Sequence, residues 1–318
     1  MGYWGVSGLL RRYSTTNSSH LELNRMSTPK IAAVIPAFNG GLVLDACITS
    51  LLGQSCPLFR VYVIDNASAD DTATLMAKYP SSQVRYSRLT ENIGPTGGFA
   101  KGMQAALDDG CELVWLMDQD STAQEDTLQK LVAYLDSDAA VVAAAPAKLE
   151  IDGQLWVGEN LDGGIGAGKQ LYEGPPFGVE STLWSGMLVR ASAIREAGLP
   201  LTELFGWWCD GEYCFRLRKH GRVVLVPESR IHHHQTGAVH LDFAGYWKHY
   251  YYQRNSMYLY LNGHLPSPGL PRMLSDIGKQ IMYILLRQDH KIQRLQIVFT
   301  AAFHALSGRM GRGPAWLH

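Results

Sequence analysis

Short apolar runs alternate with helical patterns over the first half of the chain. The runs at 31–36, 59–64 and 113–117 each end at a polar residue, as expected for strands buried in a sheet. Further strands are predicted at 83–87 and 141–145, with helices at 41–53, 71–78, 97–109 and 122–135. Strands that alternate with helices are typical of an α/β fold with a doubly wound, mostly parallel sheet.

The pattern changes beyond residue 150. Glycine is dense between Gly153 and Gly178, which predicts loops and an antiparallel hairpin. Strands at 182–190 and 222–226, helices at 192–197 and 210–220, and a helical pattern over 244–308 follow. We therefore expect an N-terminal extension (1–28), a catalytic domain (29–240, with halves 29–125 and 126–240) and a C-terminal helical region (241–318).

Polar side chains follow the strands of the predicted sheet. They are Asn39, Asp65, Asn92 and the pair Asp118 and Asp120. Ligands of open α/β sheets bind at the carboxyl ends of strands. The sequence therefore predicts one binding site at this rim.

Composition excludes several classes of protein. A formal net charge of -1 argues against nucleic acid as a partner. The five cysteines contain no CxxC pair, which favours a reducing, cytoplasmic setting. No run of about 18 apolar residues predicts a membrane-spanning helix.

Asp118-Gln119-Asp120 is the sharpest local signal. Two carboxylates beyond a strand end can share a hard divalent cation with the phosphate oxygens of a ligand. The alternative is an acidic loop that caps the next helix. The buried strand before the triplet favours the cation site.

Two other segments admit a ligand or a purely structural role. Asp65 can accept hydrogen bonds from a base or a ribose, or it can serve turn chemistry. The glycines at 94, 97 and 98, with Lys101 on the following helix, suit an anion. They match neither the dinucleotide-binding pattern nor the P-loop, which disfavours both of those functions.

Acids and histidines supply the remaining candidates. Asp210 and Glu212 begin a predicted helix, where acids suit the helix dipole or can act as a general base. Trp207 and Trp208 can stack on a sugar or belong to the core. Within His232–His234, alternation lets one or two side chains face a cation site.

Taken in order, six segments resemble family 2 glycosyltransferases, and most of all the bacterial rhamnosyltransferases and galactofuranosyltransferases. The segments are IAAVIPAFNG (31–40), VIDNASADDT (63–72), ENIGPTGGFAKG (91–102), VWLMDQDS (114–121), WCDGEYCFR (208–216) and IHHHQTG (231–237). The resemblance covers roughly residues 30–240 and implies the GT-A fold, with a Rossmann-like nucleotide-binding half.

The resemblance also implies roles. Asp118 and Asp120 would hold a sugar nucleotide through Mg or Mn, with His234 as a further metal ligand. Asp210 would be the catalytic base, with Glu212 in reserve because Cys209 stands where some relatives have a second Asp. The donor would be lined by Pro36, Ala37, Asn39, Asp65, Asn92, Gly94, Gly97, Gly98, Lys101 and Asp118. Pro95 departs from the Gly-Gly often found in that loop.

The implied reaction is an inverting transfer of a sugar, rhamnose or galactofuranose being favoured. The donor would be a dTDP- or UDP-sugar, and the acceptor a hydroxyl of a glycan or lipid-linked glycan in cell-surface glycan synthesis. A nucleotidyltransferase is the first alternative, but the loop after the first strand (37–41) carries no basic residue. A catalytically inactive sugar-binding module is the second.

Basic residues border the apolar runs of the C-terminal region, among them Arg272, Lys279, Arg287, Lys291 and Arg294. Helices with basic edges can lie on an anionic membrane surface, which would place the protein at the inner face of the membrane. The alternative is packing on the catalytic domain or in a homo-oligomer.

Overall fold

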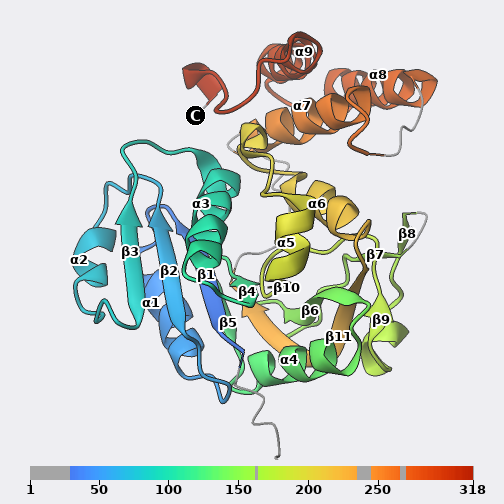
Figure 1. The fold of residues 1–318 in the computed structure, drawn as a ribbon. Coiled ribbons are helices and arrows are strands. Elements are labelled where there is room, and N and C mark those ends of the chain that lie inside the picture. Colours follow the sequence, from blue (N-terminus) through green and yellow to red (C-terminus); the bar gives the residue numbers. More distant parts are fainter. Residues whose placement is uncertain (1–28, 162–163, 235–244, 266–269, 318) are drawn as a thin grey trace, which may run out of the picture.

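The structure, a computed structural model, describes residues 29–161, 164–234, 245–265 and 270–317. The predicted extension (1–28) lies outside these residues. A twisted sheet crosses the molecule with helices on both of its faces, and three C-terminal helices form a further layer at one end (Figure 1).

The main sheet has the strand order β3-β2-β1-β4-β10-β6-β11-β5, and β9 also pairs with β11. Its strands are β1 (Ile31–Ala37), β2 (Arg60–Asp65), β3 (Val84–Arg88), β4 (Leu113–Leu116), β5 (Ser121–Ala123), β6 (Val141–Leu149), β9 (Phe177–Gly178), β10 (Leu188–Arg190) and β11 (Arg222–His233). Neighbours among β3, β2, β1 and β4 are parallel, as are β6 and β11. The short β10 is antiparallel to β4 and to β6. A separate hairpin joins β7 (Asn160–Leu161) and β8 (Ile165–Gly166).

The sheet separates two hydrophobic cores because side chains alternate along each strand. Ala32 and Val34 of β1 face one core, whereas Ile31, Ala33 and Ile35 face the other. Helices α3 (Gly94–Asp108), α5 (Ala191–Ala197) and α6 (Cys209–Leu217) contribute to the first core. Helices α1 (Gly41–Leu52), α2 (Thr72–Met76) and α4 (Thr127–Ser137) contribute to the second.

Helix α3 lies unusually close to the sheet. A Cβ atom on Gly102 would stand 2.2 Å from Val34 Cγ1, and one on Gly98 would stand 2.7 Å from Pro36 Cβ. Only glycine fits such an approach. Gly98 therefore serves helix–strand packing at a position where the sequence suggested contact with a ligand.

Three elements differ from the sequence prediction. Ser121–Ala123 form a strand beside β11 where a helix start was expected. Strand β11 continues past Pro227, because a register shift between Val226 and Arg230 removes the proline from the ladder. Helix α3 begins at Gly94, since a proline is tolerated in a first turn that has no internal N–H partner.

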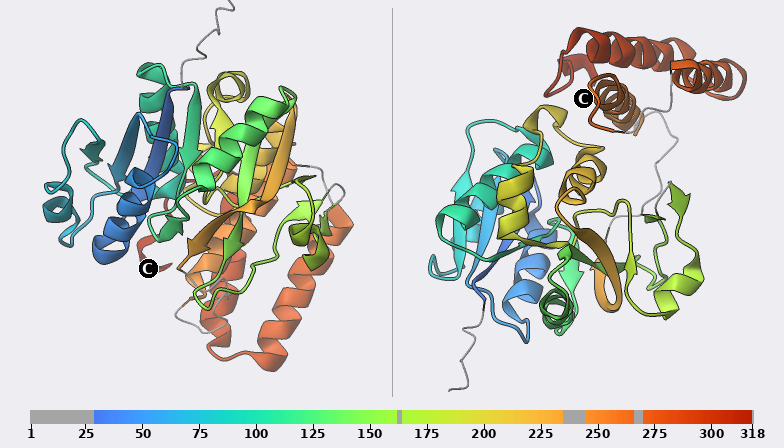
Figure 2. Two further views of the ribbon diagram at one scale, coloured as in Figure 1. Left: turned by 90° about the horizontal axis from the view of Figure 1, so that it is seen from below. Right: turned by 45° about the vertical axis from the view of Figure 1, so that its right-hand side comes forward.

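The C-terminal layer consists of α7 (Trp247–Leu261), α8 (Leu270–Arg287) and α9 (Lys291–Ser307) (Figure 2). These helices share an apolar cluster that also takes in Phe205 from the segment before α6. Short 3-10 turns are η1 (Lys169–Glu173), η2 (Thr202–Leu204) and η3 (Ala315–Leu317). Over the described ranges, no helix combines the length and the apolar character needed to span a bilayer.

Candidate active site

Two carboxylates and an imidazole meet beyond the end of β4. Strand β5 pairs with β11 and sets His233 opposite Ser121, the residue after Asp120. His233 Nε2 lies 3.8 Å from Asp118 Oδ2 and 3.6 Å from Asp120 Oδ1. One ligand atom from each residue falls within 4.8 Å of the others. Oxygen and imidazole donors at this spacing fit Mg or Mn.

The histidine in this cluster is His233, whereas the sequence analysis named His234. His234 Nε2 lies 3.1 Å from Thr122 Oγ1, and its backbone N–H donates to Asp120 O at 2.9 Å. Successive side chains of an extended segment point to opposite sides. The register of β11 against β5 therefore selects His233 for the acids and turns His234 away from them.

Like charges crowd Asp118. Burial, followed by the negative charges of Asp120 and then Asp210, raises the pKa of Asp118 to about 7. Between its ordinary pKa of 3.8 and about 7, the folded state holds a proton that the unfolded chain has released. Without a cation, this carboxyl therefore lowers stability as the pH rises through that window. A divalent cation would relieve the repulsion.

Cation binding should accordingly depend on pH. A carboxyl with a pKa near 7 is about one-tenth ionised at pH 6 and about nine-tenths ionised at pH 8, so Mn affinity should be roughly tenfold higher at pH 8. Isothermal titration of the protein with MnCl₂ at both pH values measures this ratio. The Asp118→Asn variant should lose most of the dependence, and equal wild-type affinities at the two pH values would contradict the assignment.

Gln119, between the two acids, fixes their loop. Its Oε1 accepts a hydrogen bond from Phe38 N at 2.9 Å, and its Nε2 donates to Phe38 O at 3.1 Å. The amide thus ties the end of β1 to the loop after β4. The sequence analysis gave Gln119 no role.

Asp210 lies in the first turn of α6. Its Oδ1 accepts a hydrogen bond from Gly211 N at 2.8 Å, and burial raises its pKa. Asp210 is near enough to Asp118 for its charge to raise the pKa of that residue. Asp210 also lines a hollow of about 500 Å³, which Trp156, Thr182 and other residues border. The candidate base therefore lies within electrostatic reach of the metal-site acids.

Glu212, the second candidate for the base, has a different role. Its side chain is fully buried, and its two oxygens accept hydrogen bonds from Arg216 Nε at 2.5 Å and Nη2 at 2.9 Å. Arg216 in turn donates to the carbonyls of Ala197 and Leu199. This bidentate pair fastens α6 to the segment after α5 and leaves Glu212 poorly placed to accept a proton.

A buried lysine balances the acids of the cleft. Lys148 Nζ lies 3.0 Å from Glu159 Oε1 and 3.0 Å from Thr182 Oγ1, and Tyr172 OH donates to the other oxygen of Glu159. The positive charge of Lys148 opposes the rise in the pKa of Asp118 and of Asp210, but burial outweighs it and both pKa values stay raised. The sequence offered no sign of this group, because its members lie on separate segments.

The segment that leads into α6 has a strained backbone. Phe205, Trp207 and Trp208 have φ values of 65°, 59° and 64°, which residues other than glycine rarely adopt. Asn255 Nδ2 donates to the carbonyls of three residues of this segment, and Arg254 Nη2 donates to the first of them at 3.1 Å. Helix α7 thus holds the backbone immediately before Asp210.

The predicted donor residues at the ends of β1 and β2 form a rim tied together by hydrogen bonds. Asp65 is fully buried, and its carboxylate accepts from Ser68 N at 2.8 Å, Ser68 Oγ at 2.5 Å and Tyr86 OH at 2.5 Å. Asn39 Oδ1 accepts from Ala69 N at 2.8 Å. Asp65 therefore serves the turn chemistry that the sequence left open.

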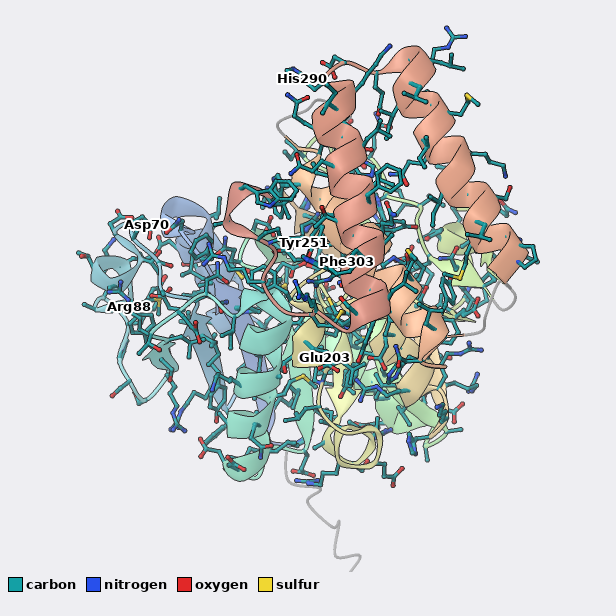
Figure 3. All side chains as sticks on the ribbon, turned by 90° about the horizontal axis from the view of Figure 1, so that it is seen from above. Asp70, Arg88, Glu203, Tyr251, His290 and Phe303 are labelled. Carbon is teal, nitrogen blue, oxygen red and sulfur yellow. The ribbon has the colours of Figure 1, made fainter. Side chains whose placement is uncertain are left out.

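Two further donor-side candidates, Pro36 and Ala37, lie at this edge of the sheet. Pro36 and Ala37 are buried in β1, and Ala37 pairs with Asp65 in the parallel register. Asp70 and Arg88 lie together at the outer side of the rim, far from the C-terminal helices (Figure 3). Asp70 Oδ1 accepts a hydrogen bond from Thr72 N at 3.1 Å, which stabilises the start of α2.

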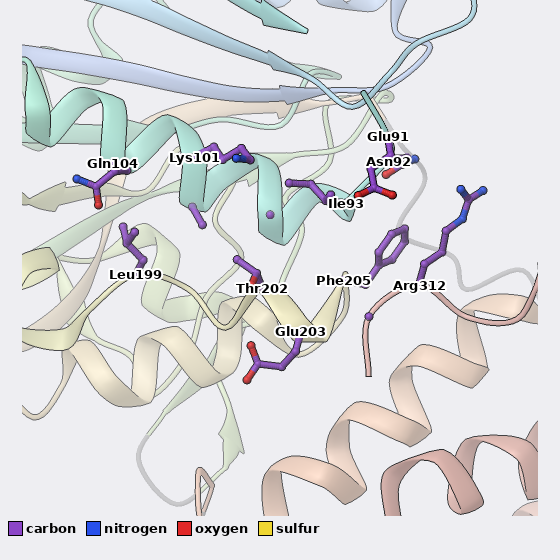
Figure 4. Close-up of a pocket in the computed structure, with 13 residues that line it drawn as sticks. Glu91, Asn92, Ile93, Lys101, Gln104, Leu199, Thr202, Glu203, Phe205 and Arg312 are labelled. Atoms are coloured by element: carbon purple, nitrogen blue, oxygen red, sulfur yellow. The ribbon is translucent and has the colours of Figure 1, made fainter. Parts of the chain in front are cut away.

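The remaining donor-side candidates line a different hollow of about 650 Å³ (Figure 4). Asn92, Gly97 and Lys101 border it on one side, and Glu203 and Arg312 border it on the other. Gly94, whose φ is 79°, packs against the Phe205 carbonyl. Among the described residues, this hollow and the one at Asp210 share no lining residue. Lys101 therefore lines a hollow other than the one at Asp210.

Comparisons with known proteins identify the family. The family model described as glycosyl transferase family 2 matches residues 32–192. The dTDP-rhamnosyl transferase RfbF of Shigella flexneri is 26% identical over 298 residues, which are 89% of this chain and 97% of RfbF. The galactofuranosyltransferase GlfT1 of Mycobacterium tuberculosis is 29% identical over 191 residues, 56% of this chain and 61% of GlfT1.

Solved structures share the fold. Residues 1–349 of TarS from S. aureus, in complex with UDP-GlcNAc, match with a TM-score of 0.61 at 17% identity, over 88% of this chain and 82% of that one. Against a longer TarS chain the TM-score is 0.58 at 16% identity, over 91% of this chain but only half of that chain. The chain therefore has the GT-A fold and belongs to glycosyl transferase family 2.

Proposed function

We propose that the protein transfers a sugar from a nucleotide diphosphate to an acceptor hydroxyl, with inversion at the anomeric carbon. The observation that carries the proposal is that Asp210 lies close enough to the cluster of Asp118, Asp120 and His233 for its charge to raise the pKa of Asp118. Rhamnose and galactofuranose are the favoured sugars, since RfbF and GlfT1 bear those names. Cell-surface glycan synthesis is the process that such a transfer would serve.

In this mechanism the acceptor oxygen attacks the anomeric carbon while the bond from that carbon to the diphosphate oxygen breaks. Asp210 accepts the hydroxyl proton, and its raised pKa makes it a better proton acceptor than an exposed aspartate. A single displacement inverts the configuration, because nucleophile and leaving group lie on opposite sides of the carbon.

Asp118, Asp120 and His233 would hold the divalent cation. When bound, Mg or Mn supplies positive charge that stabilises the departing diphosphate. Gln119 keeps the two acids in place through its pair of hydrogen bonds to Phe38. Ala37 and Asn39, on the rim beside them, would border the nucleotide.

A panel of donors tests the proposal. The purified protein is incubated with dTDP-rhamnose, UDP-galactofuranose, UDP-glucose, UDP-galactose or UDP-GlcNAc, with Mn or with EDTA, and nucleotide release and sugar transfer are measured. We expect one donor to be consumed at least tenfold faster than the others, and only with the metal. Consumption of none of them, or equal rates in EDTA, would contradict the function or its metal dependence.

We also propose that the C-terminal helices contact an anionic membrane. Along one face, α9 exposes Ile292, Phe299, Phe303 and Leu306, the first of them 81% exposed. His290 and Phe303 mark the two ends of this helix in Figure 3. An exposed apolar stripe suits a bilayer surface, and basic side chains nearby favour anionic lipid.

Sedimentation with vesicles of phosphatidylglycerol and phosphatidylcholine checks this contact. We expect binding at low salt that weakens as salt screens the basic residues. The Phe299→Ser/Phe303→Ser variant should bind at least fivefold less. Binding by neither protein at low salt would remove membrane contact and favour packing of this face against a second copy of the chain.

A further inference from the structure

A second hollow continues from the one at Asp210. Its volume is about 830 Å³, within the range of roughly 300–1,000 Å³ typical of small-molecule sites. Four residues line both hollows, namely Asn160, Ser181, Trp208 and Tyr252. The two hollows therefore adjoin, and a ligand that reaches Asp210 can extend past Trp208 toward α7 and α8.

Aromatic rings form the floor of this second hollow. The ring centroids of Trp208 and Tyr252 are 5.4 Å apart, and those of Trp208 and Tyr260 are 6.1 Å apart. Tyr252 is 52% exposed although it lies beside the core. Exposed rings of this kind offer an apolar face next to a polar tip, which suits the C–H face and the hydroxyls of a sugar ring.

Polar groups surround the rings. The side chains of Asn160, Ser181, Gln253, Ser256 and Gln280 supply amides and hydroxyls, and Glu180, Arg272 and Asp276 supply charges of both signs. Arg272 Nε lies 4.0 Å from Asp276 Oδ2, so part of this charge is internally paired. A lining of mixed donors and acceptors without an excess of basic charge fits a neutral polyol better than a phosphate or a nucleic acid.

An alkyl chain is the main competing occupant, since Met257, Leu265 and Ile277 also line the hollow. An alkyl chain would cover the amides, hydroxyls and charged groups without replacing their hydrogen bonds to water, which costs free energy. A sugar chain can replace those bonds. Because the two hollows adjoin, the sugar that precedes the reacting sugar in the acceptor would lie at Trp208 and Tyr252.

We infer that the two hollows form one acceptor groove, and that the hollow between Trp208 and α8 binds the sugars next to the one that carries the attacking hydroxyl. The inference rests on the proposed transferase function and adds the acceptor class, a neutral glycan of at least two sugars. The C-terminal helices α7 and α8 then supply one wall of the substrate site.

Binding to a glycan array tests the groove without requiring turnover. The full chain, with Mn and UDP or dTDP, is applied to neutral mono-, di-, tri- and tetrasaccharides of rhamnose, galactose, glucose and N-acetylglucosamine, attached through their reducing ends. The array also carries each monosaccharide on a decyl chain. We expect the best trisaccharide to bind at least tenfold more tightly than the monosaccharide with the same terminal sugar.

Two groove variants and one control show whether the tighter binding of the trisaccharide depends on the groove. Tyr260→Ala removes a ring, and Ser256→Trp fills the groove, so a folding defect in one leaves the other informative. Each should lower trisaccharide binding at least tenfold and change monosaccharide binding less than twofold. Tyr283→Ala, at an exposed tyrosine of α8 outside the groove lining, should change neither.

Several results would overturn the inference. The first is that glycans of every length bind the wild-type protein equally. The second is that trisaccharide binding is unchanged in both groove variants. The third is that the wild-type protein binds none of the neutral glycans. If a decyl monosaccharide binds as tightly as the trisaccharide, and the groove variants weaken that binding, the groove binds an alkyl chain. If glycans bind as expected but no sugar nucleotide is consumed, the proposed function fails and the groove stands.

Discussion

Replacing Asp210 with asparagine should lower kcat by about 10²–10⁴-fold, because the acceptor hydroxyl would lose its proton acceptor. The amide keeps the size of the side chain and cannot take a proton. Donor KM should change less than threefold, since the acids that would hold the metal and diphosphate are intact. The measurement is steady-state kinetics with the donor that the panel identifies.

The pH profile separates loss of the base from loss of structure. Wild-type kcat should fall on the acid side as Asp210 becomes protonated, at a pH above the usual range because its pKa is raised. With Mn kept saturating at every pH, so that protonation of Asp118 does not contribute, that limb should disappear in the asparagine variant. Asp108→Asn, at an exposed carboxylate near the end of α3, is the matched control and should leave kcat unchanged. Turnover of Asp210→Asn within tenfold of wild type, about 1.4 kcal/mol of barrier, would exclude the base assignment.

Replacing Asn255 with alanine should destabilise the fold and slow the reaction together. The side chain is fully buried, and its Nδ2 donates to the carbonyls of Leu204, Gly206 and Trp207 at 2.9, 2.5 and 2.9 Å. The Leu204 carbonyl keeps its hydrogen bond from Arg254, whereas those of Gly206 and Trp207 lose the donor from Asn255. A buried carbonyl without a donor costs about 1–3 kcal/mol, so we expect a loss of about 2–4 kcal/mol. Urea unfolding measures it.

The kinetic effect follows from the strained backbone that these bonds hold. Phe205, Trp207 and Trp208 adopt positive φ values that cost about 1–3 kcal/mol each and persist only while the surroundings enforce them. Relaxation would displace Asp210, and a shift near 1 Å can cost about 10²-fold in rate. Under folding conditions, kcat of Asn255→Ala should therefore fall at least tenfold.

Asn262→Ala is the control, because this exposed asparagine lies just after the same helix and its side chain donates a local hydrogen bond to Tyr258 O. It should cost less than about 1 kcal/mol and leave kcat within twofold. An Asn255→Ala protein that is less stable but has wild-type kcat would show that α7 supports the fold without positioning the base.

Strands could be predicted from the sequence where the pattern that defines them lies within a few neighbouring residues. The apolar runs of β1, β2 and β4 are buried on both faces of the sheet, so they read as continuous strands and stop at the rim. Prediction from the sequence worked less well where a neighbour decides the conformation. Residues 122 and 123 are predicted to begin a helix, but they form part of β5 because β11 pairs with this segment.

The site shows the same division. The acids at 118, 120 and 210 could be singled out because each follows a strand or starts a helix. The choice of His233 over His234 depends on strand register, which a single residue's shift reverses. Nothing in the sequence pairs Lys148 with Glu159, or Asn255 with the loop before Asp210. These contacts join segments that only folding brings together.

By itself, therefore, the sequence determined the strands, the acidic chemistry at their ends and the family resemblance, because periodicity and short motifs are properties of neighbouring residues. Only the tertiary structure decided which histidine faces the acids, that Glu212 is bound by Arg216, and that α7 and α8 wall the hollow next to Asp210. Burial and charge depend on which residues are close in space, so they distinguish between candidate site residues that the sequence alone cannot tell apart.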